Sequence, residues 1–208
     1  MKWIETIIRL VFLALFLLII TGGNMMIWLG LFAVTLIGSI FFGRFYCGYI
    51  CPMNTVMIPA DWISRKLKIQ NANPPKWLKN GVLPWVFLGI TIVVMILFKK
   101  ALQINIPILL VWLAISFLVT LIYKPEVFHN HICPFGVMQK TFGKYGRFSK
   151  QVDESACIGC KKCESVCQSN AITIGHDNKA SINTALCHQC NNCSLACPTD
   201  AIKFTRVK

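Results

Sequence analysis

The sequence predicts a helical membrane protein with four membrane-spanning helices, followed by a small polar domain of mixed helices and strands. Of its 208 residues, 55% are hydrophobic and only 14% are charged, which is too apolar for an ordinary soluble domain. Residues 10–43 contain no charged side chain, whereas the chain becomes polar after residue 150 and carries eight of its eleven cysteines there. We therefore expect a membrane domain over residues 1–149 and a second domain over residues 150–208.

The first apolar segment predicts a helical hairpin. A membrane span needs about 20 apolar residues, and the Gly22-Gly23-Asn24 sequence interrupts a run that is nearly twice as long. We expect spans near residues 5–21 and 25–42. Glu5 and Arg9 lie at the mouth of the first span, where we expect the arginine to reach the lipid headgroups.

A cleaved signal peptide is the alternative for the first apolar segment, since Lys2 precedes it and small residues follow it. No A-x-A-like cleavage site is present, and the next apolar run begins at once. We interpret the segment as an uncleaved anchor.

A second hairpin is predicted from spans near residues 81–98 and 104–123, with Lys99-Lys100 and residues 103–105 in its turn. Basic residues concentrate in the short loops on one side of these spans, which are expected to face the cytoplasm. That side carries ten basic residues and the other side only Lys99 and Lys100. Both termini are therefore expected in the cytoplasm. The ten are Lys2, Arg9, Arg44, Arg65, Lys66, Lys68, Lys76, Lys79, Lys124 and Lys140.

A basic amphipathic stretch follows each hairpin, at residues 59–69 and 138–150. Each alternates aromatic or aliphatic residues with lysine and arginine, which predicts helices on the cytoplasmic membrane surface. Solvated linkers are the alternative. The net charge of +13 is spread over these membrane-flanking segments, so lipid headgroups explain it better than nucleic acid does.

Two related motifs separate the hairpins from the amphipathic stretches: "YCGYICPMN" at residues 46–54 and "FHNHICPFG" at residues 128–136. Each contains Ile-Cys-Pro. Cys47 stands four residues before the second cysteine of the first motif, and His129 takes the matching place in the second. The order hairpin, proline motif, amphipathic stretch thus occurs twice.

The strongest signal lies in the tail, where "CIGCKKCESVCQ" at residues 157–168 and "CHQCNNCSLACP" at residues 187–198 share the spacing C-x2-C-x2-C-x3-C. Three such cysteines surround three corners of a [4Fe–4S] cubane, and the fourth cysteine of each run ligates the cluster of the other run. One predicted ligand set is Cys157, Cys160, Cys163 and Cys197; the other is Cys167, Cys187, Cys190 and Cys193. Zinc binding and disulfides are the alternatives, and both fit this spacing less well. His188 and His176 are expected to be exposed loop histidines.

Three cysteines remain, and all belong to the proline motifs. If the two halves of the membrane domain face each other, Cys47, Cys51, Cys133 and His129 form a candidate site for a third iron–sulfur centre, zinc or copper. His131 is an alternative ligand. Redox-active thiols and simple structural packing are the competing interpretations.

Residues 150–208 resemble a bacterial two-[4Fe–4S] ferredoxin, and "FGRFYCGYICP" at residues 42–52 together with that tail resembles the NapH/MauN group of membrane-bound ferredoxins. The group's pattern has a first cysteine in both proline motifs, and here the second motif departs from it at His129. The resemblance implies electron transfer between a cytoplasmic or quinone pool and a partner redox complex.

We therefore expect a membrane-bound electron-transfer subunit with two [4Fe–4S] clusters, rather than a stand-alone enzyme. No nucleophile–base set, phosphate loop or dinucleotide fingerprint is present in the sequence. The expected partners are membrane lipid, redox partner subunits, and a quinone, soluble ferredoxin or flavoprotein; nucleic acid is not expected. The alternative function is a cytoplasmic-face copper or iron reductase or assembly factor that uses the proline motifs, and a third is a scaffold in which the clusters only stabilise the fold.

Overall fold

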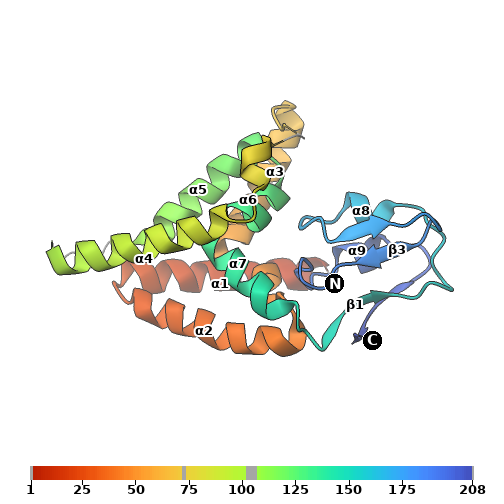
Figure 1. Cartoon of the computed structure of the whole chain (residues 1–208), viewed down its shortest axis with the longest axis horizontal. Helices are drawn as coiled ribbons and strands as arrows, with labels where there is room; N and C mark the ends of the chain where they lie inside the picture. The colour runs from red at the N-terminus through yellow and green to blue at the C-terminus, as the bar shows by residue number, and fades with distance from the viewer. Residues whose placement is uncertain (1, 72–73, 102–106, 208) are drawn as a thin grey trace.

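The computed structural model describes residues 2–71, 74–101 and 107–207. Long apolar helices make up one end of the molecule, and two small two-stranded sheets with short helices make up the other (Figure 1). The helices and helical turns are α1 (Lys2–Thr21), α2 (Met25–Phe42), η1 (Tyr46–Ile50), α3 (Pro52–Leu67), η2 (Lys76–Lys79), α4 (Leu83–Ala101), α5 (Ile108–Ile122), α6 (Pro125–His131), α7 (Pro134–Gly143), α8 (Lys162–Ser165) and α9 (Asn192–Ala196). The strands are β1 (Phe148–Val152), β2 (Ile172–Ile174), β3 (Ala180–Ile182) and β4 (Ile202–Arg206).

Three helices are long and apolar enough to cross a membrane: Trp3–Thr21 within α1, the whole of α2, and the whole of α4. They correspond to the first three predicted spans. The fourth predicted span contains α5, an apolar helix of 15 residues. The predicted turn at residues 103–105 lies outside the described residues.

The turn between α1 and α2 shows why the first apolar run forms two helices. Gly23 adopts a positive φ of 76°, which L-amino acids with side chains rarely adopt. The Gly22 and Asn24 amides close the end of α1 by donating to the Leu18 and Ile19 carbonyls, both at 3.1 Å. The chain then reverses into α2, as the Gly-Gly-Asn sequence predicted.

The N-terminal end of α1 and the C-terminal end of α2 both point towards the small domain (Figure 1). The proline motifs therefore emerge at the junction between the helices and the tail. A buried cluster of Phe32, Tyr46, Trp112 and Phe128 forms the core there, together with the proline-motif cysteines.

The first amphipathic stretch lies at the end of α3, which packs along α5. Ser64 Oγ donates to the Leu121 carbonyl at 2.6 Å, and Asn71 continues the contact by pairing with Tyr123. Trp62 and Leu67 are exposed on the other side of α3. For the second stretch, the prediction of a helix over residues 138–150 is wrong beyond Gly143, because α7 ends there and β1 begins at Phe148.

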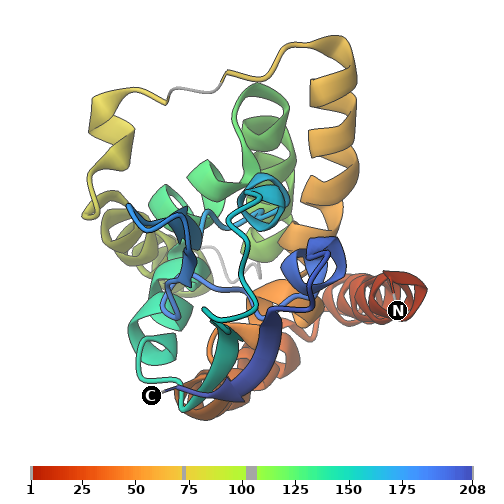
Figure 2. The same ribbon diagram turned by 90° about the vertical axis from the view of Figure 1, so that its right-hand side faces the viewer.

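The tail contains two antiparallel pairs, β1 with β4 and β2 with β3. β1 and β4 run side by side in front of the membrane helices when the molecule is viewed from the side of the tail (Figure 2). The register pairs Phe148 with Arg206 and Val152 with Ile202, so the two ends of the tail close on each other. The short helices α8 and α9 pack together, and they also contact β2 and β4, respectively.

Candidate functional site

The cysteines of the tail meet in two sets that exchange their fourth members. Cys157, Cys160, Cys163 and Cys197, here called the outer quartet, line one hollow. Val152, Ile174 and Ile202 form its apolar wall. Four thiols around one hollow are the donor set that a [4Fe–4S] cubane requires, so these residues fit the cluster.

The second set, called the inner quartet, consists of Cys167, Cys187, Cys190 and Cys193. Cys190, Cys193 and Cys167 each lie close enough to Cys187 to raise the pKa of its thiol. Cys167 comes from the first cysteine run and the other three from the second. The Cys167 sulfur also accepts a hydrogen bond from the Ala171 amide at 3.3 Å, as a cluster-binding thiolate would.

The two runs fold alike. Gly159 and Gln189, the third residues of the two runs, both have positive φ, at 68° and 57°. Asn170 and Asp200, which lie three residues after the last cysteine of each run, also have positive φ, at 52° and 50°. The internal duplication therefore extends from the sequence to the backbone.

The thiols of the inner quartet lie in a less polar environment. Burial raises the pKa of Cys187 to about 12 and that of Cys193 to about 11. Partial burial also acts to raise the pKa of Cys197 in the outer quartet, but hydrogen bonds from Thr199 and Ala201 outweigh it and lower that pKa. Burial also raises the pKa of Cys163 in the outer quartet. The cost of forming a thiolate before metal binding is thus higher at Cys187 and Cys193 than at Cys197.

The proline motifs build two nearly identical helix starts. Cys51 precedes α3 with φ −65° and ψ 117°, and Cys133 precedes α7 with φ −64° and ψ 117°. A proline follows each cysteine and occupies the first turn, where its missing N–H costs no hydrogen bond. The Cys133 sulfur accepts a hydrogen bond from the Gly136 amide at 3.2 Å. Helix N-termini favour negative charge, so each helix start lowers part of the cost of forming a thiolate at its cysteine.

Cys47, Cys51 and Cys133, here called the cysteine triad, are buried together in the core at the junction. Burial raises the pKa of all three thiols, and Cys47 and Cys133 add to the effect at Cys51. Among the described residues, no three His, Cys, Asp or Glu side chains approach closely enough to chelate a single metal ion. That finding covers the two quartets as well as the triad.

Arg44 is completely buried beside the triad. Its Nη2 lies 3.9 Å from the Cys47 sulfur and 3.5 Å from the His129 carbonyl oxygen, and its Nη1 donates to Asn130 Oδ1 at 3.2 Å. In the part of the chain that the structure describes, ion pairs join Arg9 to Glu5 and Arg65 to Asp61, and no carboxylate pairs with Arg44. A buried guanidinium without a carboxylate needs another negative partner, and the triad is the neighbouring source of one.

His129 lies next to the triad, but its Nε2 is within hydrogen-bonding distance of Asn54 Oδ1, at 3.2 Å. Burial and Arg44 lower its pKa to about 3, so its imidazole is neutral. The buried Nδ1 of His131, the alternative ligand, has no hydrogen-bond partner among the residues that the structure describes. The expectation that His188 is exposed is wrong: its side chain is 3% exposed, because its ring packs edge to face on His129. Its neighbour in the sequence, Gln189, is 5% exposed.

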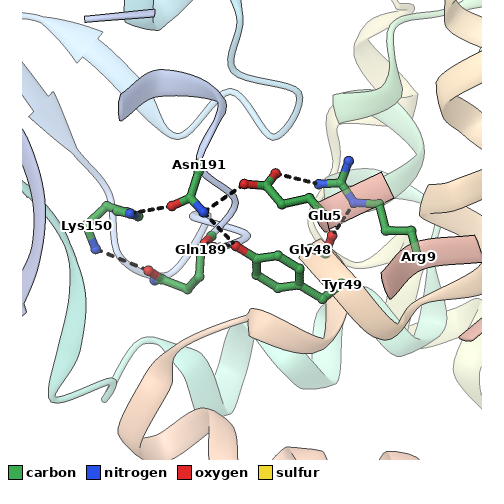
Figure 3. A network of polar contacts seen from close by, with 7 residues as sticks. All are labelled: Glu5, Arg9, Gly48, Tyr49, Lys150, Gln189 and Asn191. Atoms are coloured by element: carbon green, nitrogen blue, oxygen red, sulfur yellow. Dashed lines mark hydrogen bonds and ion pairs between the residues drawn. The ribbon is translucent and has the colours of Figure 1, made fainter. Parts of the chain in front are cut away.

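A polar network joins the membrane helices to the inner quartet (Figure 3). Asn191 donates to Glu5 Oε1 at 2.8 Å and to the Tyr49 hydroxyl at 3.3 Å, and Tyr49 donates to the Gln189 carbonyl at 3.2 Å. Glu5 pairs with Arg9 at 4.0 Å, and Arg9 Nε donates to the Gly48 carbonyl at 2.8 Å. Glu5 and Arg9 are therefore buried in the junction, and the expectation that Arg9 reaches the headgroups is wrong.

The close contact between η1 and the loop of the inner quartet leaves no room for a side chain at Gly48. A Cβ atom built there would lie 2.2 Å from the His188 carbonyl oxygen. The glycine of the first proline motif thus allows the backbone of the inner quartet's loop to approach η1 directly. Sequence reasoning missed this role, and it also missed Arg44, His188 and Gln189. The available signal was the contrast between "CIGC" in the first run and "CHQC" in the second.

Comparison with known families finds two matches. The family described as a 4Fe-4S binding domain matches twice, at residues 24–70 and 105–152, so it covers each proline motif once. The family described as a 4Fe-4S dicluster domain matches residues 150–204. No solved structure matches the chain.

The chain is also similar to several curated proteins. It is 26% identical over 197 residues to the ferredoxin-type protein NapH of Haemophilus influenzae, an alignment that covers 83% of this chain and 69% of the relative. It is 27% identical over 165 residues to the methylamine utilization ferredoxin-type protein MauN of Methylobacillus flagellatus, which covers 70% of this chain and 56% of that protein. The regulatory protein NosR of Stutzerimonas stutzeri is 27% identical over 169 residues, but these are 72% of this chain and only 23% of NosR.

Proposed function

Because this chain is a homologue of the NapH and MauN ferredoxin-type proteins and carries 4Fe-4S domains, we propose that it is a multi-pass inner-membrane protein with two [4Fe–4S] clusters on its cytoplasmic side. The protein transfers single electrons between a soluble or quinone pool and a partner redox complex. When bound, the clusters supply reversible one-electron chemistry at potentials set by their surroundings. The chain's own residues provide the ligands, the apolar walls and the attachment to the membrane.

The observation that carries this proposal is the exchange of the fourth cysteine. The outer quartet takes Cys197 from the second run, around a hollow walled by apolar residues, and the inner quartet takes Cys167 from the first. Such crossed sets are the arrangement that two-cluster ferredoxins use. The long apolar helices, with their proline motifs at the junction, support a position of both sets close to the membrane surface.

The cytoplasmic placement rests on the loop charges. On the side of the junction, Arg44 follows α2, and α3 carries Arg65 and Lys66 in its last turn. On the opposite side, α4 ends with Lys99 and Lys100. Basic loops remain on the cytoplasmic side during insertion. The tail, which follows from the basic side, would then also be cytoplasmic.

We propose the cysteine triad as a third redox centre. Two of its sulfurs are held at helix starts with matched backbone angles, and a buried cation without a carboxylate lies 3.9 Å from the third. This environment suits an anionic iron–thiolate centre. The alternative function is reduction of a copper or iron ion that the same cysteines would bind. It has less support because the relatives of this chain are named ferredoxin-type proteins.

The proposal is tested on the full chain purified without oxygen and reconstituted in liposomes. Mixing with a reduced low-potential ferredoxin should bleach the visible absorption of the clusters, and a menaquinone analogue should restore it. A Cys190→Ala variant should lose one cluster and much of this exchange, whereas Ser165→Ala, an exposed neighbour of the outer quartet, should behave as the wild type. Reduction of Cu(II) without exchange with either carrier would instead support the metal reductase.

The triad is tested separately by counting iron. If it holds a centre, Cys51→Ala and Cys133→Ala should lower the iron per chain while leaving both cubane signals in the electron paramagnetic resonance (EPR) spectrum. Unchanged iron in both variants would assign these cysteines to packing or thiol chemistry.

A further inference from the structure

The duplication in the tail allows a position-by-position comparison of the two cysteine quartets. Each residue near the inner quartet has a counterpart near the outer quartet, thirty positions away in the sequence. His188 corresponds to Ile158, Asn191 to Lys161, and Ser169 to Thr199. Because the fold is otherwise repeated, the residues that differ between the two copies indicate how the roles of the two quartets differ.

The counterparts differ consistently in exposure. His188 and Ser169 are 3% and 4% exposed. Their counterparts Ile158 and Thr199 are exposed, the isoleucine at 66%. Lys161 is exposed as well, and Cys160 is the one exposed cysteine in the described part of the chain.

The inner residues are buried because they form the junction with the membrane domain. Asn130 donates to the Ser169 carbonyl at 2.9 Å, which attaches the loop after Cys167 to α6. Gln189 and Asn191 hold the loop between Cys187 and Cys193 to η1 and α1 (Figure 3). The His188 ring lies against His129, whose carbonyl oxygen is 3.5 Å from Arg44, and Arg44 in turn is 3.9 Å from Cys47. A short path of packed groups thus leads from the inner quartet to the triad.

We propose that the two quartets have separate and fixed roles: the outer quartet exchanges electrons with a soluble carrier, and the inner quartet is the connection to the membrane domain through the His188–His129 contact. This proposal rests on the proposed function, since it requires a cluster in each quartet. The single electron comes from, or returns to, a soluble one-electron carrier of the ferredoxin or flavodoxin class. The iron–thiolate centre proposed at the triad is the group that is reduced or oxidised at the other end, so the proposal rests on that centre as well. Electrons pass through the outer quartet, the inner quartet and the triad in this spatial order, or in its reverse.

Two hydroxyl groups, one at each quartet, allow each EPR signal to be assigned to its quartet by mutation. Ser169 Oγ lies 3.5 Å from the Cys167 sulfur, and Thr199 Oγ1 lies 3.6 Å from the Cys197 sulfur. A hydrogen bond to a ligand sulfur stabilises the more negative reduced cluster, so removing it lowers the midpoint potential. Ser169→Ala should shift the potential of the inner signal alone, and Thr199→Ala should shift that of the outer signal alone.

The test is EPR of the full chain, purified without oxygen in detergent and poised at partial reduction, with and without dysprosium–EDTA as a water-soluble relaxing agent. The signal that moves in Thr199→Ala should show a several-fold larger increase in half-saturation power than the signal that moves in Ser169→Ala. Equal effects on both signals, or a larger effect on the Ser169-linked signal, would overturn the assignment of roles. A protein with fewer than two cluster signals would instead refute the proposed function.

The role of His188 is tested with its counterpart as the control. His188→Ala should make the Ser169-linked signal sensitive to dysprosium, whereas Ile158→Ala should leave the Ser169-linked signal as in the wild type. If His188→Ala fails to load iron, His129→Leu opens the same contact from the membrane side and leaves the cysteine loop unaltered. The proposed contact would be contradicted if the inner signal stayed insensitive to dysprosium in His188→Ala. If His188→Ala does not bind iron, the same result in His129→Leu would contradict it.

Discussion

His188 and His129 meet edge to face, with their ring centroids 4.6 Å apart and their planes at 80°. One histidine lies between two cysteines of the inner quartet, and the other lies one helical turn before Cys133 of the triad. The contact therefore joins the two parts of the protein at the point where both carry their cysteines.

The histidine contact predicts a loss of stability in acid. Burial, then Arg44, lowers the pKa of His129 to about 3, and burial, then His129, Arg44 and Arg9, lowers the pKa of His188. The unfolded chain binds these protons near pH 6.5 and the folded chain does not, so stability is present above that pH and is lost as the pH falls. Between pH 7.5 and 5.5 we expect a loss of about 1 kcal/mol for each histidine in anaerobic unfolding experiments.

His188→Phe, which keeps an aromatic ring in the contact, should reduce this dependence on pH. His176→Phe is the control, because His176 is exposed in a turn and should leave the dependence unchanged. An equal or greater stability at pH 5.5 than at pH 7.5 would argue against two neutral, buried imidazoles.

Gly48 predicts a steric dependence of the junction. Because a Cβ there would lie 2.2 Å from the His188 carbonyl oxygen, Gly48→Ala must push the inner quartet's loop away from η1, at a cost of about 1–3 kcal/mol. The iron of the inner quartet should then be lost faster to a chelator, as followed by absorption. Gly81→Ala is the matched control, since a Cβ at Gly81 meets nothing within 4 Å. Equal rates for the two variants would contradict the close approach.

Arg44 predicts an electrostatic effect on the triad. A unit positive charge at 3.9 Å from a sulfur stabilises a negative charge there by an amount on the order of 4 kcal/mol at the effective dielectric of protein sites. Arg44→Met should therefore make the midpoint potential of a centre at the triad more negative, as measured by a redox titration followed by EPR. Arg44→Lys keeps the charge and should show the smaller shift. Identical potentials in the two variants would rule out a charge effect.

Removal of iron should unfold the tail and spare the membrane helices. The core of the tail contains few apolar side chains other than its cysteines, chiefly Ile172, Ala180 and Ile202. Such a small core cannot offset the conformational entropy of the tail without the metal–thiolate bonds. Treatment with a chelator should expose residues 150–208 to protease while the helical circular dichroism persists. Resistance of the iron-free tail to protease would show that its fold does not need the clusters.

Much of the architecture was predictable because it depends on local patterns. Charge-free segments of about 20 residues predicted the apolar helices α1, α2 and α4, and the repeated cysteine motif predicted a ferredoxin-like domain after them. The Gly22-Gly23-Asn24 turn was predictable from the same kind of signal, since glycine adopts the positive φ that the structure shows.

The junction was not predictable, because it depends on contacts between distant segments. Glu5 and Arg9 look like residues at a membrane interface, yet they bind Asn191 and Gly48, more than 35 positions away in each case. His188 looks like a surface histidine until the loop that contains it is docked on α6. The helix predicted over residues 138–150 failed past Gly143 because Phe148 pairs with Arg206 in a strand, a partner that no local pattern reveals.

The central claim is that the two cysteine runs of the tail hold a pair of cubane clusters by exchanging their fourth ligands. The most direct measurement is iron and acid-labile sulfide per chain on protein purified without oxygen, combined with EPR of the reduced sample. We predict at least about eight irons per chain and the signals of two reduced [4Fe–4S] clusters. A folded, colourless protein that contains zinc or no metal would contradict the account.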